Sequence, residues 1–325
     1  MAAISYKLLC LLFTIHVESG MFYYPWVSKK VPCEVHVENS SSSIIFDCRH
    51  QNLEAVPLEI NDNATCLILS YYHINKISNV TFQKFRNLTQ LYLKYNAINQ
   101  AMAQPLGFFR NLTKLEKLDL SHNHLQEVPK GLSPSITSLE LNANQIVSIK
   151  NNTFSELKNL KELYMDWNYL SHNKHYFRLA GVTVRLAFIE KLPQLKVLNL
   201  SWNSISTLTD RQLSSNSLQE LVFKGNCLGI LWGDKDEKYI HFFTNLSSLT
   251  YLDISHNRLL KIPSEAFLSL PPNLTQLFLN NNRLQVFIFA NFTRLKYLKL
   301  LDLSQNKFRT IHISFKVPAV SAVKG

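Results

Sequence analysis

The sequence predicts an α/β leucine-rich-repeat solenoid, a horseshoe whose short parallel strands line the concave face. The pattern LxLxxN recurs nine times in the 325 residues, and a further apolar residue stands three positions before each copy. The steps between successive asparagines run from 21 to 35 residues, and most of them match the length of one leucine-rich repeat. The repeat asparagines are Asn96, Asn123, Asn144, Asn168, Asn203, Asn226, Asn257, Asn282 and Asn306.

Each position of the pattern has a physical reason. Leu118 and Leu120 flank one residue, so they point to the same side of a short strand. One repeat cannot bury these leucines, but stacked repeats pair their strands in parallel around a continuous core. The asparagine ends the strand, where its amide can donate to and accept from backbone groups of the turn. An earlier copy, ATCLILSYY, has Tyr72 where the asparagine is expected.

The longest step, 35 residues from Asn168 to Asn203, needs a separate explanation. It contains a second asparagine turn, Leu170-Ser171-His172-Asn173, only five residues after the first. Two repeat ends cannot stack five residues apart. The sequence leaves two interpretations open: an insertion loop that resembles a turn, or a join between two repeats that are not neighbours in a complete solenoid.

Residues 1–20 predict a secretory signal peptide, because Lys7 precedes an apolar run from Leu8 to Ile15 and small residues follow it. This run is too short to span a bilayer, and no other stretch has 18 consecutive apolar residues. In a secreted chain, Cys33 and Cys48 predict a disulfide that closes a cap over the amino-terminal end of the core.

The other two cysteines of the mature chain, Cys66 and Cys227, are predicted to be separate thiols buried within repeats. No second cysteine or histidine cluster accompanies either of them, which disfavours reactive or metal-binding thiols.

Ten N-x-S/T sequons favour a chain that enters the secretory pathway. Asn199 differs from most of the others, because it lies between Leu198 and Leu200 on a predicted strand, where a glycan would crowd the concave face. The sequons begin at Asn39, Asn63, Asn79, Asn87, Asn111, Asn151, Asn199, Asn245, Asn273 and Asn291.

The sequence contains no nucleophile elbow, HExxH motif, phosphate loop or dinucleotide fingerprint. Asp234, Asp236 and Glu237 suggest a calcium loop, but their spacing does not match one, and a solvated loop is favoured. His122 and His124 lack a third ligand, so neither a metal nor another cofactor is predicted. The predicted activity is therefore binding and not catalysis.

The formal net charge of +11 favours acidic partners, namely nucleic acid, heparan-like glycans or anionic lipid. Histidines would add positive charge in an acidified compartment. The alternative is a soluble surface whose charge has no partner, because no block of five or more basic residues exists.

The residue before each repeat asparagine is expected on or near the concave face, and aromatic residues and histidines are frequent there. Base stacking is one use for such rings, and packing against neighbouring long side chains is the favoured alternative. We call this set the column; it comprises Tyr71, Tyr95, His122, Ala143, Trp167, Trp202, Gly225, His256, Asn281 and Gln305.

Three segments carry a family resemblance. They read HYFRLAGVTVRLAFIEKLPQLKVLNLSWNSISTLTD from His175 to Asp210, then LQELVFKGNCLGILWGDKDEKYIHFF and IPSEAFLSLPPNLTQL. They resemble the ectodomain of the endosomal, nucleic-acid-sensing Toll-like receptors, the group of receptors 7, 8 and 9. The part from Pro32 to Asn168 resembles the amino-terminal cap and first repeats of the same group. It lacks the extra cysteines of receptors 7 and 9, which brings it nearest to receptor 8.

The resemblance implies an innate immune pattern-recognition ectodomain, related to receptors that sense single-stranded RNA and nucleoside degradation products. The family forms homodimers in the endosome or endoplasmic reticulum, and its membrane anchor and adaptor binding belong to the full-length receptor. Its small-ligand pocket lies at the dimer interface. The residues of one wall match Tyr176, Gly181, Val182 and Thr183, which offer a ring, close approach and hydrogen-bonding groups. The opposite wall has no counterpart here, so we expect weak or lost nucleoside binding.

The resemblance also implies that a long run of repeats is missing at the join between Tyr169 and Asn173. The predicted organisation is a signal peptide (1–20), a cap (21–63), a first arc (64–169), a second arc (170–310) and an unstructured tail (311–325). No carboxy-terminal cap, transmembrane helix or signalling domain follows. We therefore expect a truncated isoform or partial gene product, secreted or retained in the secretory pathway. The alternative is an extracellular leucine-rich-repeat protein that binds matrix or acts as a decoy.

Overall fold

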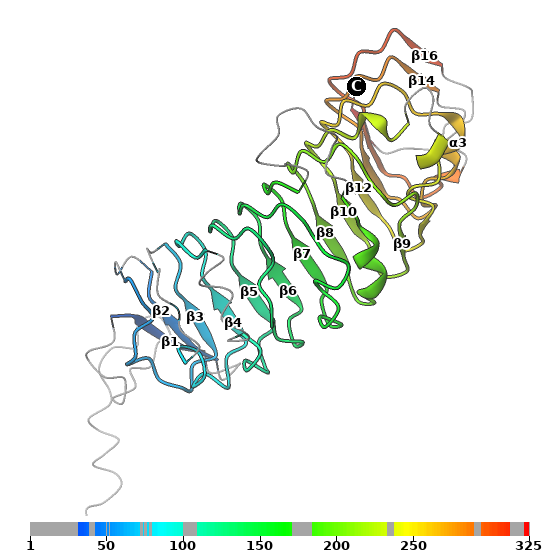
Figure 1. Ribbon diagram of the computed structural model, residues 1–325. Helices are drawn as coiled ribbons and strands as arrows, with labels where there is room; N and C mark the ends of the chain where they lie inside the picture. Colours follow the sequence, from blue (N-terminus) through cyan, green and yellow to red (C-terminus); the bar gives the residue numbers. More distant parts are fainter. Residues whose placement is uncertain are drawn as a thin grey trace, which may run out of the picture.

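The computed structural model describes residues 32–38, 43–49, 51, 53–71, 74, 77, 80–99, 109–170, 184–232, 237–288, 294–312 and 322–324. Their strands lie side by side along an elongated solenoid. It runs from β1 (Glu34–Glu38) and β2 (Ser43–Asp47) at the blue end to β14 (Val286–Ile288) and β16 (Thr310–His312) at the red end (Figure 1). The predicted leucine-rich-repeat architecture is confirmed, because each repeat adds one short strand to a parallel sheet.

Among the described residues, the main sheet has thirteen strands, in the order β1-β2-β3-β4-β5-β6-β7-β8-β10-β12-β13-β15-β17. Every neighbouring pair from β2 onward is parallel. The strands are β1 (Glu34–Glu38), β2 (Ser43–Asp47), β3 (Cys66–Ile68), β4 (Gln90–Tyr92), β5 (Lys117–Asp119), β6 (Ser138–Glu140), β7 (Glu162–Tyr164), β8 (Val197–Asn199), β10 (Glu220–Val222), β12 (Tyr251–Asp253), β13 (Gln276–Phe278), β15 (Leu300–Asp302) and β17 (Ala322–Lys324).

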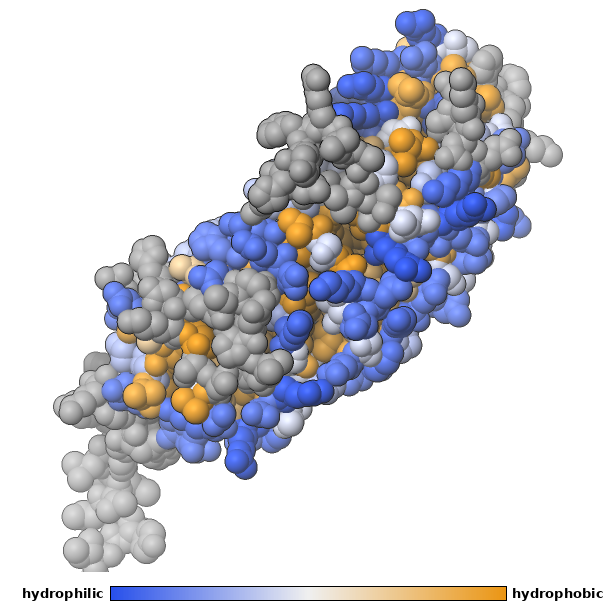
Figure 2. Space-filling model, in the orientation of Figure 1, coloured by the Kyte–Doolittle hydropathy of each residue, from blue (hydrophilic) through white to orange (hydrophobic). Residues whose placement is uncertain are grey.

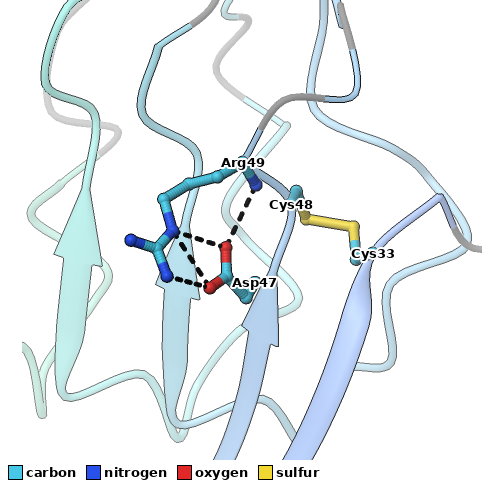
Figure 3. Close-up of a disulfide and its surroundings, with 4 residues drawn as sticks. All are labelled: Cys33, Asp47, Cys48 and Arg49. Carbon is cyan, nitrogen blue, oxygen red and sulfur yellow. Dashed lines mark hydrogen bonds and ion pairs between the residues drawn. A yellow bond between two sulfur atoms is a disulfide. The ribbon is translucent and has the colours of Figure 1, made fainter.

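The amino-terminal cap is an antiparallel hairpin of β1 and β2. The predicted disulfide is confirmed: Cys33 precedes β1, Cys48 follows β2, and the bond joins the two strands at one end (Figure 3). Beside it, the Arg49 guanidinium binds both carboxylate oxygens of Asp47, with Nε at 2.9 and 3.0 Å. This contact lowers the pKa of Asp47 below its ordinary value.

The predicted leucine positions form one continuous core. Leu118 and Leu120 expose 0% and 1% of their surface, and the corresponding leucines of the other repeats are similarly buried. Phenylalanines fill the space behind the sheet, including Phe82, Phe154 and Phe188. Because each repeat packs only on its neighbours, the core extends along the whole described solenoid.

The repeat asparagines form a hydrogen-bonded ladder, which is buried except at the partly buried Asn306. Nδ2 of Asn123 donates to the carbonyl oxygens of Leu93 and Leu120, at 3.0 and 3.1 Å, and its Oδ1 accepts the N–H of Ile98 at 3.0 Å. Each asparagine thus joins its own turn to the preceding repeat, as expected for a group that donates and accepts. The other eight repeat the pattern.

The sheet and the ladder continue across the longest step. β7 pairs with β8, with Leu163 opposite Leu198, and Nδ2 of Asn203 donates to the Met165 carbonyl oxygen at 2.9 Å. Among the described residues, Asn203 is therefore the rung that follows Asn168. Residues 171–183, including the second asparagine turn from Ser171 onward, lie outside the described residues.

Short helices and two small parallel sheets lie outside the main sheet, and Figure 1 labels α3 (Ser264–Leu268), β9 (Ser214–Ser215), β14 and β16 among them. Phe188, Leu228 and Phe267 on these helices are buried in the core. The helices are η2 (Ala187–Lys191), η3 (Leu228–Ile230), η4 (Glu237–Tyr239) and α3 (Ser264–Leu268). The small sheets pair β9 (Ser214–Ser215) with β11 (Asn245–Leu246), and β14 (Val286–Ile288) with β16 (Thr310–His312).

The carboxy-terminal segment differs from the unstructured tail expected at 311–325. β16 continues to His312, and β17 (Ala322–Lys324) pairs in parallel with β15. The physical reason is that the last repeat strand has unpaired backbone groups along its edge, and a following segment can satisfy them by pairing. The alternation typical of a repeat is absent from this segment, so the sequence did not predict the strand.

Cys66 is buried, as predicted, and burial raises the pKa of its thiol to about 11. Cys227 is only partly buried, because it follows Asn226 in a turn and not within a strand. No helix among the described residues is long and apolar enough to cross a membrane.

Candidate functional site on the concave sheet

The column residues share one unusual backbone conformation. All nine that are not glycine have φ between 52° and 69°, in the left-handed region, and Gly225 has φ 69°. The turn after each strand requires this conformation so that the backbone can bond to the next repeat. His122 N–H donates to the Asn142 carbonyl oxygen at 2.9 Å, and Ala143 N–H donates to that of Asp166 at 2.8 Å. Uniform turns thus bring one side chain from each repeat into a line.

Aromatic rings in this line stack on one another. At the amino-terminal end, Tyr71 and Tyr95 have ring centroids 4.8 Å apart, and Tyr95 and His122 have centroids 3.9 Å apart, with planes inclined by 19° and 23°. We call these three residues the amino-terminal stack. Tyr71 exposes 52% and Tyr95 exposes 40% of its surface. The rings thus pack on their neighbours, as the favoured alternative expects, and they still face solvent.

A second group of rings follows further along. Trp167 and Trp202 stack with centroids 5.2 Å apart and planes inclined by 21°, and Trp202 and His256 are tilted at 5.6 Å. Trp167 is 57% exposed. Between Trp202 and His256 stands Gly225, and the indole of Trp202 lies over it. A Cβ at Gly225 would lie 2.3 Å from two atoms of that ring.

The two groups of rings are separated by Ala143. An open recess of about 730 Å³ lies between them. Its described lining comprises Tyr95, His122, Asn123, His124, Asn142, Ala143, Asn144, Gln145, Asp166, Trp167 and Tyr169.

Carboxylates gather on the same face, on or next to β6, β7 and β10: Glu140, Glu162, Asp166 and Glu220. Burial raises the pKa of Asp166 above its ordinary value, and Glu140 raises it further. Burial and the charge of Glu162 likewise raise the pKa of Glu220. A chain with net positive charge therefore has a negative field at the centre of its concave sheet.

Basic side chains lie mainly toward the amino-terminal stack. Lys94 Nζ lies 5.1 Å from the centroid of the Tyr95 ring, and Lys117 Nζ lies 3.2 Å from Glu140 Oε1. Burial and then the charge of Lys94 lower the pKa of His122. Figure 2 shows hydrophobic residues along the middle of the solenoid, between hydrophilic residues at both margins.

The predicted pocket residues Tyr176, Gly181, Val182 and Thr183 lie outside the described residues. Asp234 and Asp236 of the acidic loop lie outside them as well. In the part of the chain that the structure describes, no group of three or more His, Cys, Asp or Glu residues could hold a metal ion.

Seven of the ten sequons lie on described residues. Asn63, Asn111, Asn245 and Asn273 are exposed, whereas Asn87, Asn151 and Asn199 are partly buried. Nδ2 of Asn199 donates to Asp166 Oδ1 at 3.1 Å, and its Oδ1 accepts from the Ser201 hydroxyl. Asn39, Asn79 and Asn291 lie outside the described residues.

Sequence reasoning found the column but not its interruption. The signal was present, because Ala143 and Gly225 both replace a ring at a repeating position. The sequence alone could not distinguish them, since only the structure shows that Trp202 closes one gap while the other stays open.

A family model described as leucine rich repeat matches residues 62–125 and 240–284. The chain is 55% identical over 134 residues to Toll-like receptor 8 of Homo sapiens, a match that spans 41% of this chain and 13% of that protein. The chain carries an ectodomain segment of the Toll-like receptor 7, 8 and 9 type. Toll-like receptor 7 of Mus musculus is 40% identical over 159 residues, 49% of this chain and 15% of that protein. Toll-like receptor 9 of Felis catus is 38% identical over 135 residues, a match that spans 42% of this chain and 13% of that protein.

The matches thus span less than a sixth of each of these Toll-like receptors. Among solved structures, the crystal structure of the LRIM1/APL1C complex resembles this fold, with a TM-score of 0.59 and 22% identity. The matched region covers 80% of this chain and 44% of the chain in that crystal structure. This second likeness concerns the fold alone, and the Toll-like receptor type rests on the sequence matches.

Proposed function

We propose that this chain is an innate immune receptor ectodomain segment that binds single-stranded RNA or its degradation products. The observation that carries the proposal is the half-exposed amino-terminal stack on the concave sheet, in a chain related to Toll-like receptors. Every nucleobase has a π face, so exposed aromatic rings bind single strands with little sequence preference. No catalytic role is part of this proposal.

The charges beside the rings define where a strand can lie. Lys94 is close to Tyr95 and can contact a phosphate of a strand that lies along the stacked rings. Glu140, Glu162 and Asp166 would repel phosphates further along the sheet. The proposed path of the strand therefore follows the amino-terminal stack and leaves the acidic centre free.

The family's nucleoside pocket is a separate matter. Tyr176, Gly181, Val182 and Thr183 match one of its walls by resemblance, and the opposite wall has no counterpart in the sequence. We propose that guanosine- and uridine-like ligands bind weakly or not at all at these residues. Calorimetry that finds micromolar or tighter nucleoside binding, lost in Tyr176→Ala, would overturn this part.

The compartment is proposed from the signal peptide and the sequons. A lumenal or endosomal chain should carry glycans at exposed sequons such as Asn63, Asn111 and Asn245. Folded protein should carry none at Asn199, because a glycan there would replace a hydrogen on the amide that bonds Asp166. Mass spectrometry of peptides from the secreted or lumenal protein reports the occupancy of each site.

The 35-residue step supports a further part of the proposal, that residues 64–169 and 170–310 are two arcs of a longer receptor joined near Tyr169–Asn173. Transcript sequencing tests this directly. Reads that contain additional coding sequence at the join, and none that lack it, would identify the present chain as a partial version of a full receptor. Reads that cross the join as written establish it as a product.

The binding experiment uses the purified full chain and a fluorescently labelled, uridine-rich single-stranded RNA at a pH of about 5.5, where unperturbed histidines are charged. Affinity should fall steeply between about 50 and 200 mM salt, with a log–log slope of about −0.7 for each phosphate contacted. An absence of RNA binding at low salt and acidic pH contradicts direct sensing by this chain.

The matrix-binding or decoy alternative draws on the same charge of +11. At equal concentrations of negative charge, a matrix protein should bind heparan sulfate at least as tightly as it binds RNA. Competition separates the two: if heparan sulfate displaces RNA only at much higher charge concentration, ring stacking contributes and the receptor proposal stands. If the two polyanions compete equally, the matrix alternative is favoured.

A further inference from the structure

The interruption of the column at Ala143 has a definite size. Neighbouring strands of a sheet lie about 4.8 Å apart, so His122 and Trp167, two repeats apart, occupy positions separated by about 9.6 Å. The stacked rings of the column have centroid separations between 3.9 and 5.2 Å. One planar ring fits between them at the spacing that the column already uses.

The backbone is regular through the interruption. His122 bonds to Asn142, Ala143 to Asp166, and Trp167 N–H to the Ser201 carbonyl oxygen at 3.0 Å, as in the rest of the ladder. The gap therefore comes from the missing side chain and not from a distorted turn. At the other interruption, Trp202 leans over Gly225 and fills the place. The gap at Ala143 coincides with an open recess.

The recess has aromatic rings and one carboxylate among its described lining residues. Tyr95 and His122 of the amino-terminal stack and Trp167 of the second group are in its lining, together with the rings of His124 and Tyr169. Asp166 is in the lining, while no lysine or arginine is among its described residues. Asn199 Nδ2 donates to one oxygen of Asp166 at 3.1 Å, a neutral contact that does not cancel the charge of the carboxylate. Glu140 adds to the same negative field, and Lys117, whose Nζ lies 3.2 Å from Glu140 Oε1, offsets part of it.

We propose that the recess at Ala143 binds one planar aromatic cation, that is, a flat heteroaromatic ring that carries a protonated amine or amidine. The ring stacks between His122 and Trp167, and its N–H groups donate to the carboxylate of Asp166. Stacking alone accepts any flat ring, and the field of Asp166 and Glu140 selects a cation over an anion. This site goes beyond the proposed RNA surface, because phosphates are disfavoured in it.

The probe is 9-aminoacridine, a planar cation, titrated into nucleic-acid-free full chain and followed by its fluorescence. Acridine-9-carboxylate has the same ring system with the opposite charge and serves as the matched anion. The proposal expects the cation to bind at least about tenfold more tightly than the anion, since an unscreened ion–carboxylate contact is favourable and the reverse is repulsive. Equal binding of the two probes would overturn the charge selection.

Two substitutions locate the probe. Ala143→Trp fills the gap with a ring that the same backbone conformation already carries at Trp167 and Trp202, and it should reduce affinity by about tenfold or more because one stacking place is lost. Asp166→Asn keeps the acceptor for Asn199 and removes the charge, so it should weaken only the cationic probe. Gln305→Ala, at the far end of the column, is the control and should leave both probes unchanged.

The outcomes decide between the sites. Unchanged acridine binding in Ala143→Trp, in a variant that melts like the parent chain, would contradict the proposal. RNA binding should survive Asp166→Asn, whereas acridine binding should weaken. If RNA fails to bind at all but the cation still binds in a manner sensitive to Ala143→Trp, the proposed function is wrong and this inference stands.

Discussion

The indole of Trp202 lies over the α-carbon of Gly225, so closely that a Cβ there would be 2.3 Å from the ring atoms Cδ2 and Cε3. This contact closes one gap in the column and keeps Trp202 between Trp167 and His256. The absence of a side chain at Gly225 therefore determines where the ring of Trp202 lies.

Gly225→Ala should therefore destabilise the protein. The substitution introduces the clash and places a side chain at φ 69°, and together these should cost about 1–3 kcal/mol. Thermal melting followed by circular dichroism measures the effect. In the double variant Trp202→Ala/Gly225→Ala, the loss should be smaller than the sum of the single losses. A fully additive result would show that the ring contact is unimportant.

Asn123→Ala should be among the more damaging single substitutions of a polar residue. It removes the donor to Leu93 and Leu120 and the acceptor for Ile98, all in buried surroundings. Unsatisfied buried groups cost about 1–3 kcal/mol each, so a total loss of roughly 3 kcal/mol or more is expected. Asn280→Ala, an asparagine outside the ladder, should change stability by less than about 0.5 kcal/mol. Similar melting of both variants would contradict the role of the ladder.

Reduction of the cap disulfide should destabilise the amino-terminal end first. The bond joins Cys33 to Cys48 across 15 residues, a separation for which loop closure is worth about 3 kcal/mol. Limited proteolysis with and without reductant should show earlier cleavage near β1 and β2 when the bond is broken. In Cys33→Ser/Cys48→Ser, reductant should have no further effect. A further effect would point to a bond elsewhere.

Two carboxylates should give pH effects of opposite sign. The pKa of Glu220 is raised by burial and by Glu162, so its ionised form opposes folding. Glu220→Gln should then raise the melting temperature at pH 7, and the gain should vanish below the ordinary carboxyl pKa of about 4.3.

The pKa of Asp47 is lowered by Arg49. Asp47→Asn should lower the melting temperature at pH 7, and that loss should disappear as the pH falls through the lowered pKa. Parallel pH profiles for the two variants would contradict both assignments.

The leucine and asparagine positions made the sheet, the core and the ladder predictable. Leu118 and Asn123 behave as their pattern requires, because a repeat gives each residue type the same surroundings in every copy. The two cysteines of the cap were equally predictable, since a secreted solenoid needs its end closed. The pairing of β17 with β15 was not, because Ala322–Lys324 carries none of the repeat pattern and pairs through its backbone.

The site was only partly predictable, for a related reason. The sequence gives the order of column residues, from Tyr71 to Gln305, but not the left-handed turn that aligns them or the tilt of each ring. Whether a small residue leaves a recess depends on the side-chain conformation of its neighbours. The ring of Trp202 lies over Gly225, whereas a recess remains at Ala143. The acidic character of the central sheet was also hidden, because a net charge of +11 averages over faces of opposite sign.

The most direct test of the proposed function compares RNA binding by the parent chain with that of Tyr95→Ala and of Gln305→Ala, by fluorescence anisotropy at low salt and a pH of about 5.5. Tyr95 stands between Tyr71 and His122, so its loss should weaken binding by about tenfold and leave the salt slope unchanged, since stacking and not phosphate contact is removed. Gln305→Ala should bind as the parent chain does. Equal affinity of Tyr95→Ala and the parent chain, or no binding by either, would contradict a nucleic-acid-binding role for the stacked rings of the column.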